Sequence, residues 1–197
     1  YTHLVFHTKS SLAEQSTPTS LNLTDVISSV SSVRFVDKDL DAGELGGTVT
    51  WGAPRDVSQV THFVVCLATS SSGEGKWQSG SDVSVGVSHF LMLADTALLN
   101  FTHLVVYTKS SLIEQTTPTA LSLTDVASSV SSVGFVDKDL DALELGGTVT
   151  WIAPGSSLDE CAPGSGWDIS QVTQYVVYLV TSEEGEGKWQ FGSDVAV

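Results

Sequence analysis

The chain has 197 residues, of which 41% are hydrophobic, and it carries a net charge of -15 with only eight basic residues. Such a composition indicates one or two globular domains with a packed core and argues against a disordered chain. The shortage of Lys and Arg argues against nucleic acid and anionic membrane surfaces as partners, because proteins bind both through basic side chains.

A tandem repeat organises the sequence. Residues 1–51 and 101–151 align without a gap and differ at ten of fifty-one positions. Self-similarity at a fixed spacing indicates one folding unit copied head to tail, with about a hundred residues in each copy. Beyond these segments the alignment needs an insertion at 155–167 in the second copy. Because insertions in repeat proteins collect in loops, we expect a loop there.

The regular elements predicted within one unit are short β-strands. Apolar residues alternate with polar ones, as they do in half-buried strands. Between runs of Gly, Pro, Ser, Asp and Asn we expect about seven strands per unit, among them 32–36, 48–51, 60–67, 83–93, 103–108 and 117–123. Helical spacing is not sustained anywhere, although 94–99 fits one helical turn. This pattern predicts an antiparallel β-sandwich.

Acidic residues gather ahead of the strand at 48–51 and again in the second copy. The candidate metal ligands are Asp37, Asp39, Asp41, Glu44, Asp137, Asp139, Asp141 and Glu144. Ca²⁺ takes six to eight oxygen ligands at about 2.3–2.6 Å, and alternating carboxylates in a loop supply several of them. In an extended strand, same-face carboxylates lie about 6.6 Å apart, so a calcium site requires this segment to turn back on itself. The alternative is a solvated acidic loop that discourages pairing of sheet edges.

Several residues resemble those of fibronectin type III modules. The Trp-x-x-Pro step at Trp51 and Trp151 looks like the second strand of that family. Val60 and Phe63 are similar to its apolar-x-x-aromatic third strand, and Phe101 stands roughly where the family has a corner aromatic. The resemblance implies an all-β protein of tandem immunoglobulin-like (fibronectin type III-like) antiparallel β-sandwiches. The sequence also resembles long tandem repeats in large predicted proteins of unicellular algae.

This resemblance divides the chain into parts of the array. Residues 26–125 form one complete sandwich, 1–25 supply the last strands of a preceding unit, and 126–197 supply the first strands of a following unit. The two part-units together lack only the segment that corresponds to 86–100. The simpler interpretation places the missing strands in a longer chain. The alternative is that the part-units pair with each other, within one chain or between neighbours.

Other candidate sites depend on single residues. Asn22 and Asn100 each begin an Asn-x-Thr pattern, which is a glycosylation acceptor if the chain enters a secretory compartment. Trp77 and Trp189 follow a Gly-Glu-Gly-Lys hairpin turn, where a partly exposed aromatic ring can stack on a carbohydrate. Cys66 has no counterpart in the other copy, and we expect it to be a buried thiol rather than part of a repeated disulfide framework.

We expect no catalysis, because the histidines are scattered and most change between copies; only His3 and His103 repeat, inside a strand. The favoured function is a structural or adhesive spacer of a large repetitive extracellular or surface protein, whose partners are neighbouring repeats of the same or an identical chain and other proteins or glycans. No cofactor is expected apart from the candidate Ca²⁺, and no membrane span occurs in this window. The alternatives are a calcium- or carbohydrate-binding module and an accessory subunit of a larger complex, an organelle lumen included.

Overall fold

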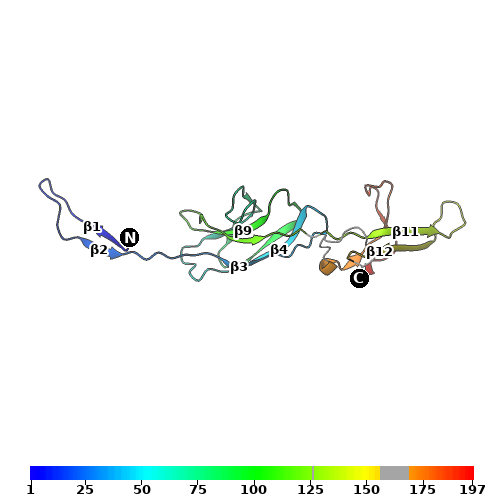
Figure 1. Cartoon of the computed structure of the whole chain (residues 1–197), viewed down its shortest axis with the longest axis horizontal. Coiled ribbons are helices and arrows are strands. Elements are labelled where there is room, and N and C mark those ends of the chain that lie inside the picture. The colour runs from blue at the N-terminus through cyan, green and yellow to red at the C-terminus, as the bar shows by residue number, and fades with distance from the viewer. Residues whose placement is uncertain (126, 156–168) are drawn as a thin grey trace.

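The computed structural model describes residues 1–125, 127–155 and 169–197, and in this part of the chain nearly every regular element is a β-strand. The one helical element described is a 3₁₀ turn, η1 (Ile169–Gln171). All strand pairings are antiparallel, which confirms the predicted all-β class. Figure 1 shows an elongated molecule in which a hairpin, a sandwich and a group of short sheets follow one another. Within the described residues, no helix has the length and apolar character needed to cross a membrane.

A three-stranded sheet forms one layer of the central sandwich. Its strands are β3 (Ser31–Arg34), β4 (Glu44–Gly52) and β8 (His89–Ala97), in the order β3-β4-β8. The strands predicted at 32–36 and 48–51 fall on β3 and β4. Alternation places Val49 and Trp51 on the buried face of β4.

A five-stranded sheet forms the second layer. It has the order β10-β9-β5-β6, and β7 pairs with β5 beside β6. The strands are β5 (His62–Ala68), β6 (Trp77–Gln78), β7 (Val83–Ser84), β9 (His103–Lys109) and β10 (Thr119–Ser122). The two long central strands pair along their whole length, so their backbone groups are satisfied within the sheet.

The main core lies between the two sheets. Trp51 from β4 and Phe63 from β5 pack edge to face, with ring centroids 5.5 Å apart, and such a pair stabilises by about 1 kcal/mol beyond the area it buries. Both sheets contribute to one cluster of buried residues: Val30, Val33, Leu45, Val49, Trp51, Val60, Phe63, Val65, Leu67, Met92, Leu104 and Val106. The buried position of Trp51 agrees with its predicted core role.

A second apolar cluster lies on the outer face of the five-stranded sheet. It contains Val64, Cys66 and Tyr107, so β5 and β9 are buried on both faces. The turn after β5 covers this face: Lys76 lies over the Tyr107 ring, with Nζ 4.1 Å from the ring centroid, and also pairs with Glu114. Burial raises the pKa of the Cys66 thiol to about 11, as expected for an inert core cysteine.

The segment 94–99, which also fits one helical turn, does not form one up to Ala97, because β8 continues as a strand to that residue. The β4–β8 pairing shifts register between Leu45 and Gly47, which leaves an irregularity opposite them. Asp95 takes a positive φ of 60° there. Its N–H donates to Asp39 Oδ2 at 2.8 Å. Residues 94–99 show little alternation of polar and apolar side chains, so the local pattern is compatible with a helical turn. In the structure, sheet pairing on both sides of the bulge keeps this segment extended.

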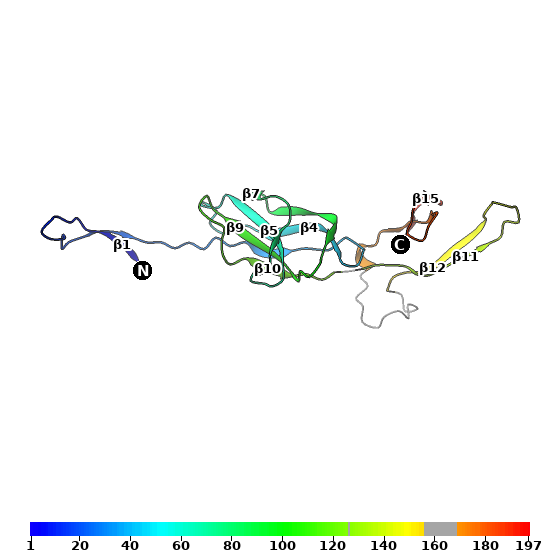
Figure 2. The same cartoon turned by 90° about the horizontal axis from the view of Figure 1, so that it is seen from above.

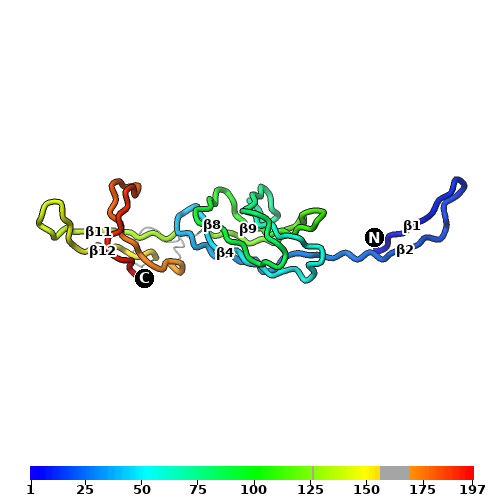
Figure 3. Tube along the Cα trace, turned by 180° about the vertical axis from the view of Figure 1, so that it is seen from behind, coloured from blue at the N-terminus to red at the C-terminus, as the bar shows by residue number. Residues whose placement is uncertain are grey.

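The N-terminal hairpin lies apart from the sandwich (Figures 1 and 3). It consists of β1 (His3–Phe6) and β2 (Thr19–Asn22). Its register, with Leu4 opposite Leu21, repeats that of β9–β10, in which Leu104 is opposite Leu121. Nearly identical local sequence therefore forms the same hairpin in both places.

Three small sheets follow the sandwich at the C-terminal end (Figure 2). They pair β11 with β12, β13 with β16 and β14 with β15. Their bounds are β11 (Ser131–Asp137), β12 (Gly147–Ile152), β13 (Gln174–Tyr175), β14 (Tyr178–Leu179), β15 (Trp189–Gln190) and β16 (Val195–Ala196). Each pairing copies one in the sandwich; Tyr178 opposite Gln190, for example, repeats Cys66 opposite Gln78. Apart from Gly155, the predicted insertion at 155–167 lies outside the described residues, as does Cys161.

Candidate functional site

The acidic segment before β4 turns back on itself. Oδ1 of Asp37 accepts hydrogen bonds from the N–H groups of Asp39 at 3.2 Å and Gly46 at 2.9 Å. Asp39 Oδ1 in turn accepts from the Asp41 N–H at 3.0 Å. Asp side chains favour such turns because they can bond the backbone two residues ahead. A calcium site requires this segment to turn back on itself, and the segment does so.

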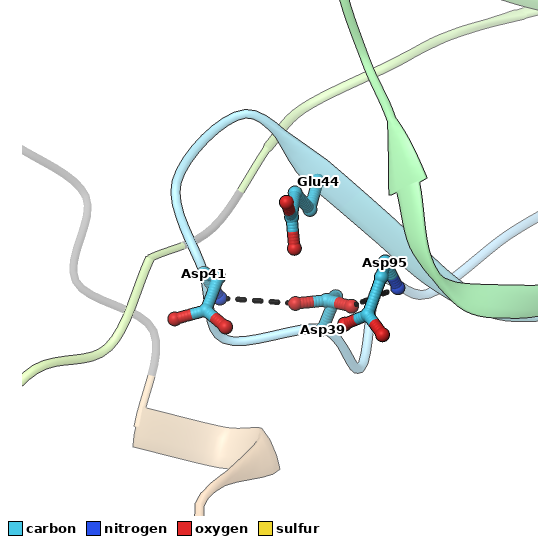
Figure 4. Close-up of side chains that lie close together, drawn as sticks. All are labelled: Asp39, Asp41, Glu44 and Asp95. Atoms are coloured by element: carbon cyan, nitrogen blue, oxygen red, sulfur yellow. Dashed lines mark hydrogen bonds between the residues drawn. The ribbon is translucent and has the colours of Figure 1, made fainter. Parts of the chain in front are cut away.

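Four carboxylates gather at this turn. Those of Asp39, Asp41, Glu44 and Asp95 each offer an oxygen, and these oxygens all lie within 4.8 Å of one another. Figure 4 shows the four side chains where β4 begins, with Asp95 reaching the group from the neighbouring strand. Oxygens that share one Ca²⁺ lie within about 5 Å of each other, since each is about 2.3–2.6 Å from the ion. The group is therefore spaced to hold a hard divalent cation.

The negative charges of the carboxylates at this turn repel one another. Desolvation, followed by the charges of Asp95, Asp39 and Asp41, raises the pKa of Glu44. Mutual repulsion of this kind is relieved when a cation binds. Asp37 supports the turn without joining the four-carboxylate group.

The segment that follows β10 is hydrogen-bonded to this same end of the sandwich. Oδ2 of Asp125 accepts from the Gly43 N–H at 2.8 Å, and the Ser128 N–H donates to the Leu40 carbonyl at 3.0 Å. Desolvation is the main cause that raises the pKa of Asp37, and the nearby Asp125 charge raises it further. Within the described residues, Asp37 Oδ2 and Asp125 Oδ1 are buried without a hydrogen-bond partner.

The second copy repeats the turn with three gathered carboxylates, those of Asp139, Asp141 and Glu144. Asp137 Oδ1 accepts from the N–H groups of Asp139 and Gly146, as Asp37 does in the first copy. Asp137 is exposed and, like Asp37, lies outside the gathered group. The sequence motif thus contains three of the four carboxylates that gather in the first copy, namely those of Asp39, Asp41 and Glu44. Sequence reasoning missed Asp95, which is far away in sequence and enters through the bulge in β8.

The remaining predicted site residues lie at the surface. Trp77 in β6 is 52% exposed and Trp189 in β15 is 62% exposed, so both side chains are partly open to solvent, as predicted for Trp77. Trp189 also packs edge to face with Phe191. Asn22 in β2 and Asn100, after β8, are both exposed.

The two histidines that repeat between copies lie at the starts of strands. His3 opens β1 and His103 opens β9. In each copy the neighbouring threonine hydroxyl bonds the Nδ1 of the ring, at 2.9 Å for His3 and 2.8 Å for His103. This contact gives both rings a local structural partner.

Comparison with protein-family models and with curated proteins gives no match to this sequence. The strand order, the repeated registers and the surface chemistry of this chain are therefore the observations that bear on its function. Those three observations describe a repeated β-structure with one acidic turn in each copy.

Proposed function

We propose that this chain is part of a tandem array of fibronectin type III-like sandwiches that serves as a structural or adhesive spacer of an extracellular or surface protein. Sandwich units in series hold attached parts at a distance, and that role needs many similar units rather than one reactive site. The partners in this proposal are neighbouring repeats and other proteins or glycans at the surface.

The strand order supports the immunoglobulin-like part of this proposal. Sandwiches of that type place the first, second and fifth strands in one sheet and the third, sixth and seventh in the other. Here β3, β4 and β8 form one sheet, while β5, β9 and β10 belong to the other. The observation that carries the proposal is the recurrence of these registers: β1–β2 repeats β9–β10, β11–β12 repeats β3–β4, and β14–β15 repeats β5–β6.

Single-molecule stretching of the whole chain, tethered at both ends, tests the spacer role. The complete sandwich should resist force and then open in one step. Unfolding about a hundred residues lengthens the tether by roughly 300 Å, since each extended residue spans about 3.3–3.6 Å. Smooth extension without any such step would contradict a mechanical role.

A second candidate function is calcium binding, which the four gathered carboxylates favour. Extracellular calcium modules bind with dissociation constants of about 10⁻⁴–10⁻³ M. At a Ca²⁺ concentration twenty times such a constant, the sandwich should gain roughly 2 kcal/mol in its free energy of unfolding. The turn holds the Asp39 carboxylate in place, because its two oxygens accept from the Asp41 and Asp95 N–H groups.

Calorimetric titration of the chain with Ca²⁺, alongside thermal unfolding, tests this candidate. The Asp41→Asn, Glu44→Gln double variant should abolish the calcium-dependent rise in the melting temperature of the sandwich. The matched Asp141→Asn, Glu144→Gln variant changes the three-carboxylate group and should leave that rise intact. Absence of both heat and a melting shift in the parent chain would dismiss calcium, leaving the spacer proposal unaffected.

A further inference from the structure

A hollow of about 410 Å³ lies within the central sandwich, beside the segment that connects β7 to β8. Its lining includes Trp51 from β4 and Phe63 from β5, one from each sheet, together with Val85 and Val87 from the connecting segment. All of the residues that line it belong to the same sandwich. Pockets that bind small molecules have volumes of about 300–1,000 Å³, so this hollow has the size of a site for a small molecule.

The hollow has a buried aromatic side and an accessible aliphatic side. Trp51 is 5% exposed and Phe63 is 1% exposed, whereas Val57, Val85 and Val87 are 41%, 42% and 37% exposed. Single exposed valines are ordinary on protein surfaces, but these three line one hollow together with two buried rings. A small apolar molecule that enters past the valines would therefore contact the aromatic rings.

Trp51, which lines this hollow, has a hydrogen-bond donor without an acceptor. Its Nε1 is buried and makes no hydrogen bond to any described residue. An indole N–H can only donate, and buried polar groups in folded proteins almost always have a partner. A buried donor without a partner costs free energy, and an oxygen atom placed within hydrogen-bond distance recovers it.

The backbone beside Trp51 is already engaged in other hydrogen bonds. The Ser88 carbonyl accepts from the backbone N–H of Trp51 at 3.1 Å, and the Val85 N–H donates to the Thr61 carbonyl at 3.1 Å. These two bonds hold the connecting segment against β4 and against the residue that precedes β5. The wall of the hollow is thus fixed to both sheets, while the indole N–H stays unpartnered.

The lining also restricts the charge of a ligand. None of the described residues that line the hollow has a charged side chain, and the whole chain has a net charge of -15. A carboxylate would lose its hydration there without gaining a basic partner, which is costly. A neutral carbonyl or ether oxygen loses less on burial and can still accept from the indole.

We propose that the hollow beside Trp51 binds a small, neutral and mostly apolar molecule that has one acceptor oxygen. The apolar body of the ligand packs against Phe63 and the three valines, and its oxygen accepts from Trp51 Nε1. The site is separate from the acidic turn and does not depend on the spacer or calcium proposals.

Two probes of nearly the same shape test this hydrogen bond. Cyclohexanone has the acceptor oxygen, and methylenecyclohexane has a CH₂ group in its place. The chain contains five Trp residues, and the indole signal of Trp51 in ¹H–¹⁵N correlation spectra is assigned through its contacts with the Phe63 ring. Cyclohexanone should move this signal downfield to a plateau. It should also bind about fivefold more tightly than methylenecyclohexane, which leaves the indole N–H unpartnered.

Variants of the whole chain separate the N–H from the rest of the hollow. Trp51→Phe keeps an aromatic ring and removes the N–H, so the two probes should bind it equally, as followed through the backbone amides of Val85 and Val87. Trp77→Phe is the matched control: it removes an exposed indole outside the hollow and should preserve the fivefold preference. Cyclohexanecarboxylate should bind the parent chain more weakly than cyclohexanone.

A second variant tests the hollow without changing the core. Ala53 lines the hollow and is exposed, so Ala53→Phe places a ring at its entrance and should abolish the cyclohexanone shift while the Trp51 signal remains. All titrations contain a chelator, so their outcome is independent of calcium. Absence of a saturable shift at Trp51, equal binding of the two probes by the parent chain, or an unchanged shift in Ala53→Phe would each overturn the proposal.

Discussion

Two hairpins of nearly the same sequence experience different surroundings in this molecule. β9–β10 belongs to a five-stranded sheet, in which β9 pairs with β5 and β10 is at the edge, and Leu104, Val105 and Val106 are almost inaccessible to solvent. β1–β2 has the same register and nearly the same residues, yet its apolar side chains are open to water.

The local sequence is therefore sufficient to specify the hairpin and its register. It does not decide whether the hairpin is buried. Turn residues and cross-strand pairs are sufficient to define which residues face each other. Burial requires β5 on one side and the β3-β4-β8 sheet across the core. The same substitution at matched positions of the two hairpins therefore separates the stability that comes from burial in the sandwich from that of the strand itself.

The largest contrast is expected from truncating the same leucine in each hairpin. Leu104→Ala removes a fully buried side chain and should lower the free energy of unfolding of the sandwich by about 3 kcal/mol. Leu4→Ala should leave that value unchanged in dilute solution. Urea denaturation followed by Trp fluorescence measures both, and equal losses in the two variants would show that β1–β2 belongs to the same cooperative unit.

The next contrast concerns the turn that covers the outer face. A Cβ at Gly73 would lie 1.8 Å from Tyr107 Oη, and the residue has a φ of 86°. Gly73→Ala should destabilise the sandwich by about 2 kcal/mol, through backbone strain and overpacking. The nearest atom at Gly185, its counterpart, is Lys188 Cε at 3.1 Å.

Thermal unfolding of the sandwich checks this second contrast. Gly185→Ala should leave the sandwich transition where it is. Adding Tyr107→Phe to Gly73→Ala removes the clashing hydroxyl and should recover part of the loss. A loss that Tyr107→Phe does not reduce would mean that backbone strain, rather than the phenol, is responsible.

A smaller effect of opposite sign is expected at the acidic turn. Asp37→Asn keeps the oxygen that accepts from Gly46 and removes a buried charge close to Asp125, so it should stabilise the sandwich by about 1 kcal/mol without calcium. Asp137→Asn, at the exposed counterpart, should have no effect. Thermal unfolding in a chelator measures both, and destabilisation by Asp37→Asn would contradict this account.

The direction of the Asp37 shift also predicts a pH dependence. Because burial raises the pKa of Asp37 in the folded state, the folded chain binds this proton more readily than the unfolded chain. The contribution of Asp37 therefore becomes more favourable as the pH falls through the raised value towards the ordinary carboxyl range. The amide that replaces this carboxyl in the Asp37→Asn variant does not titrate, so the difference in stability between the two proteins should shrink over that range.

The smallest contrast compares two carboxylates that follow the same strand in each copy. The hydrogen bond from Lys109 is the main cause that lowers the pKa of Asp82. Its stabilising contribution is therefore present above the ordinary carboxyl pKa of about 4 and is lost as the pH falls through the lower folded value. Asp82→Asn should reduce the loss in the free energy of unfolding at acid pH by less than about 1 kcal/mol. Asp194→Asn should leave it unchanged, and identical curves for the parent and Asp82→Asn would show that the ion pair contributes nothing.

Much of the fold could be predicted from alternation. The pattern at 60–67 identifies β5, and the adjacent apolar residues Val64 and Cys66 are a sign that this strand is buried on both faces. The extension of β8 through Asp95 was missed, because pairing with β4 and not the local pattern keeps that segment extended.

The candidate site was predictable only where its residues are close in sequence. Asp39, Asp41 and Glu44 belong to one motif, and the structure gathers them as the motif suggests. Asp95 joins through a bulge fifty-six residues away from Asp39, a contact that no spacing rule reveals. The exposure of Leu4 was equally hidden, since its sequence neighbourhood matches that of the buried Leu104.

The near identity of the two hairpins also has a kinetic consequence. While the chain refolds, β5 meets two strand pairs that fit it, one that precedes it and one that follows it. Because the free energy of loop closure changes slowly with loop length, neither encounter is strongly preferred. We therefore expect a fraction of molecules to join β5 first to residues 3–22 and to reach the native arrangement only after that contact dissociates.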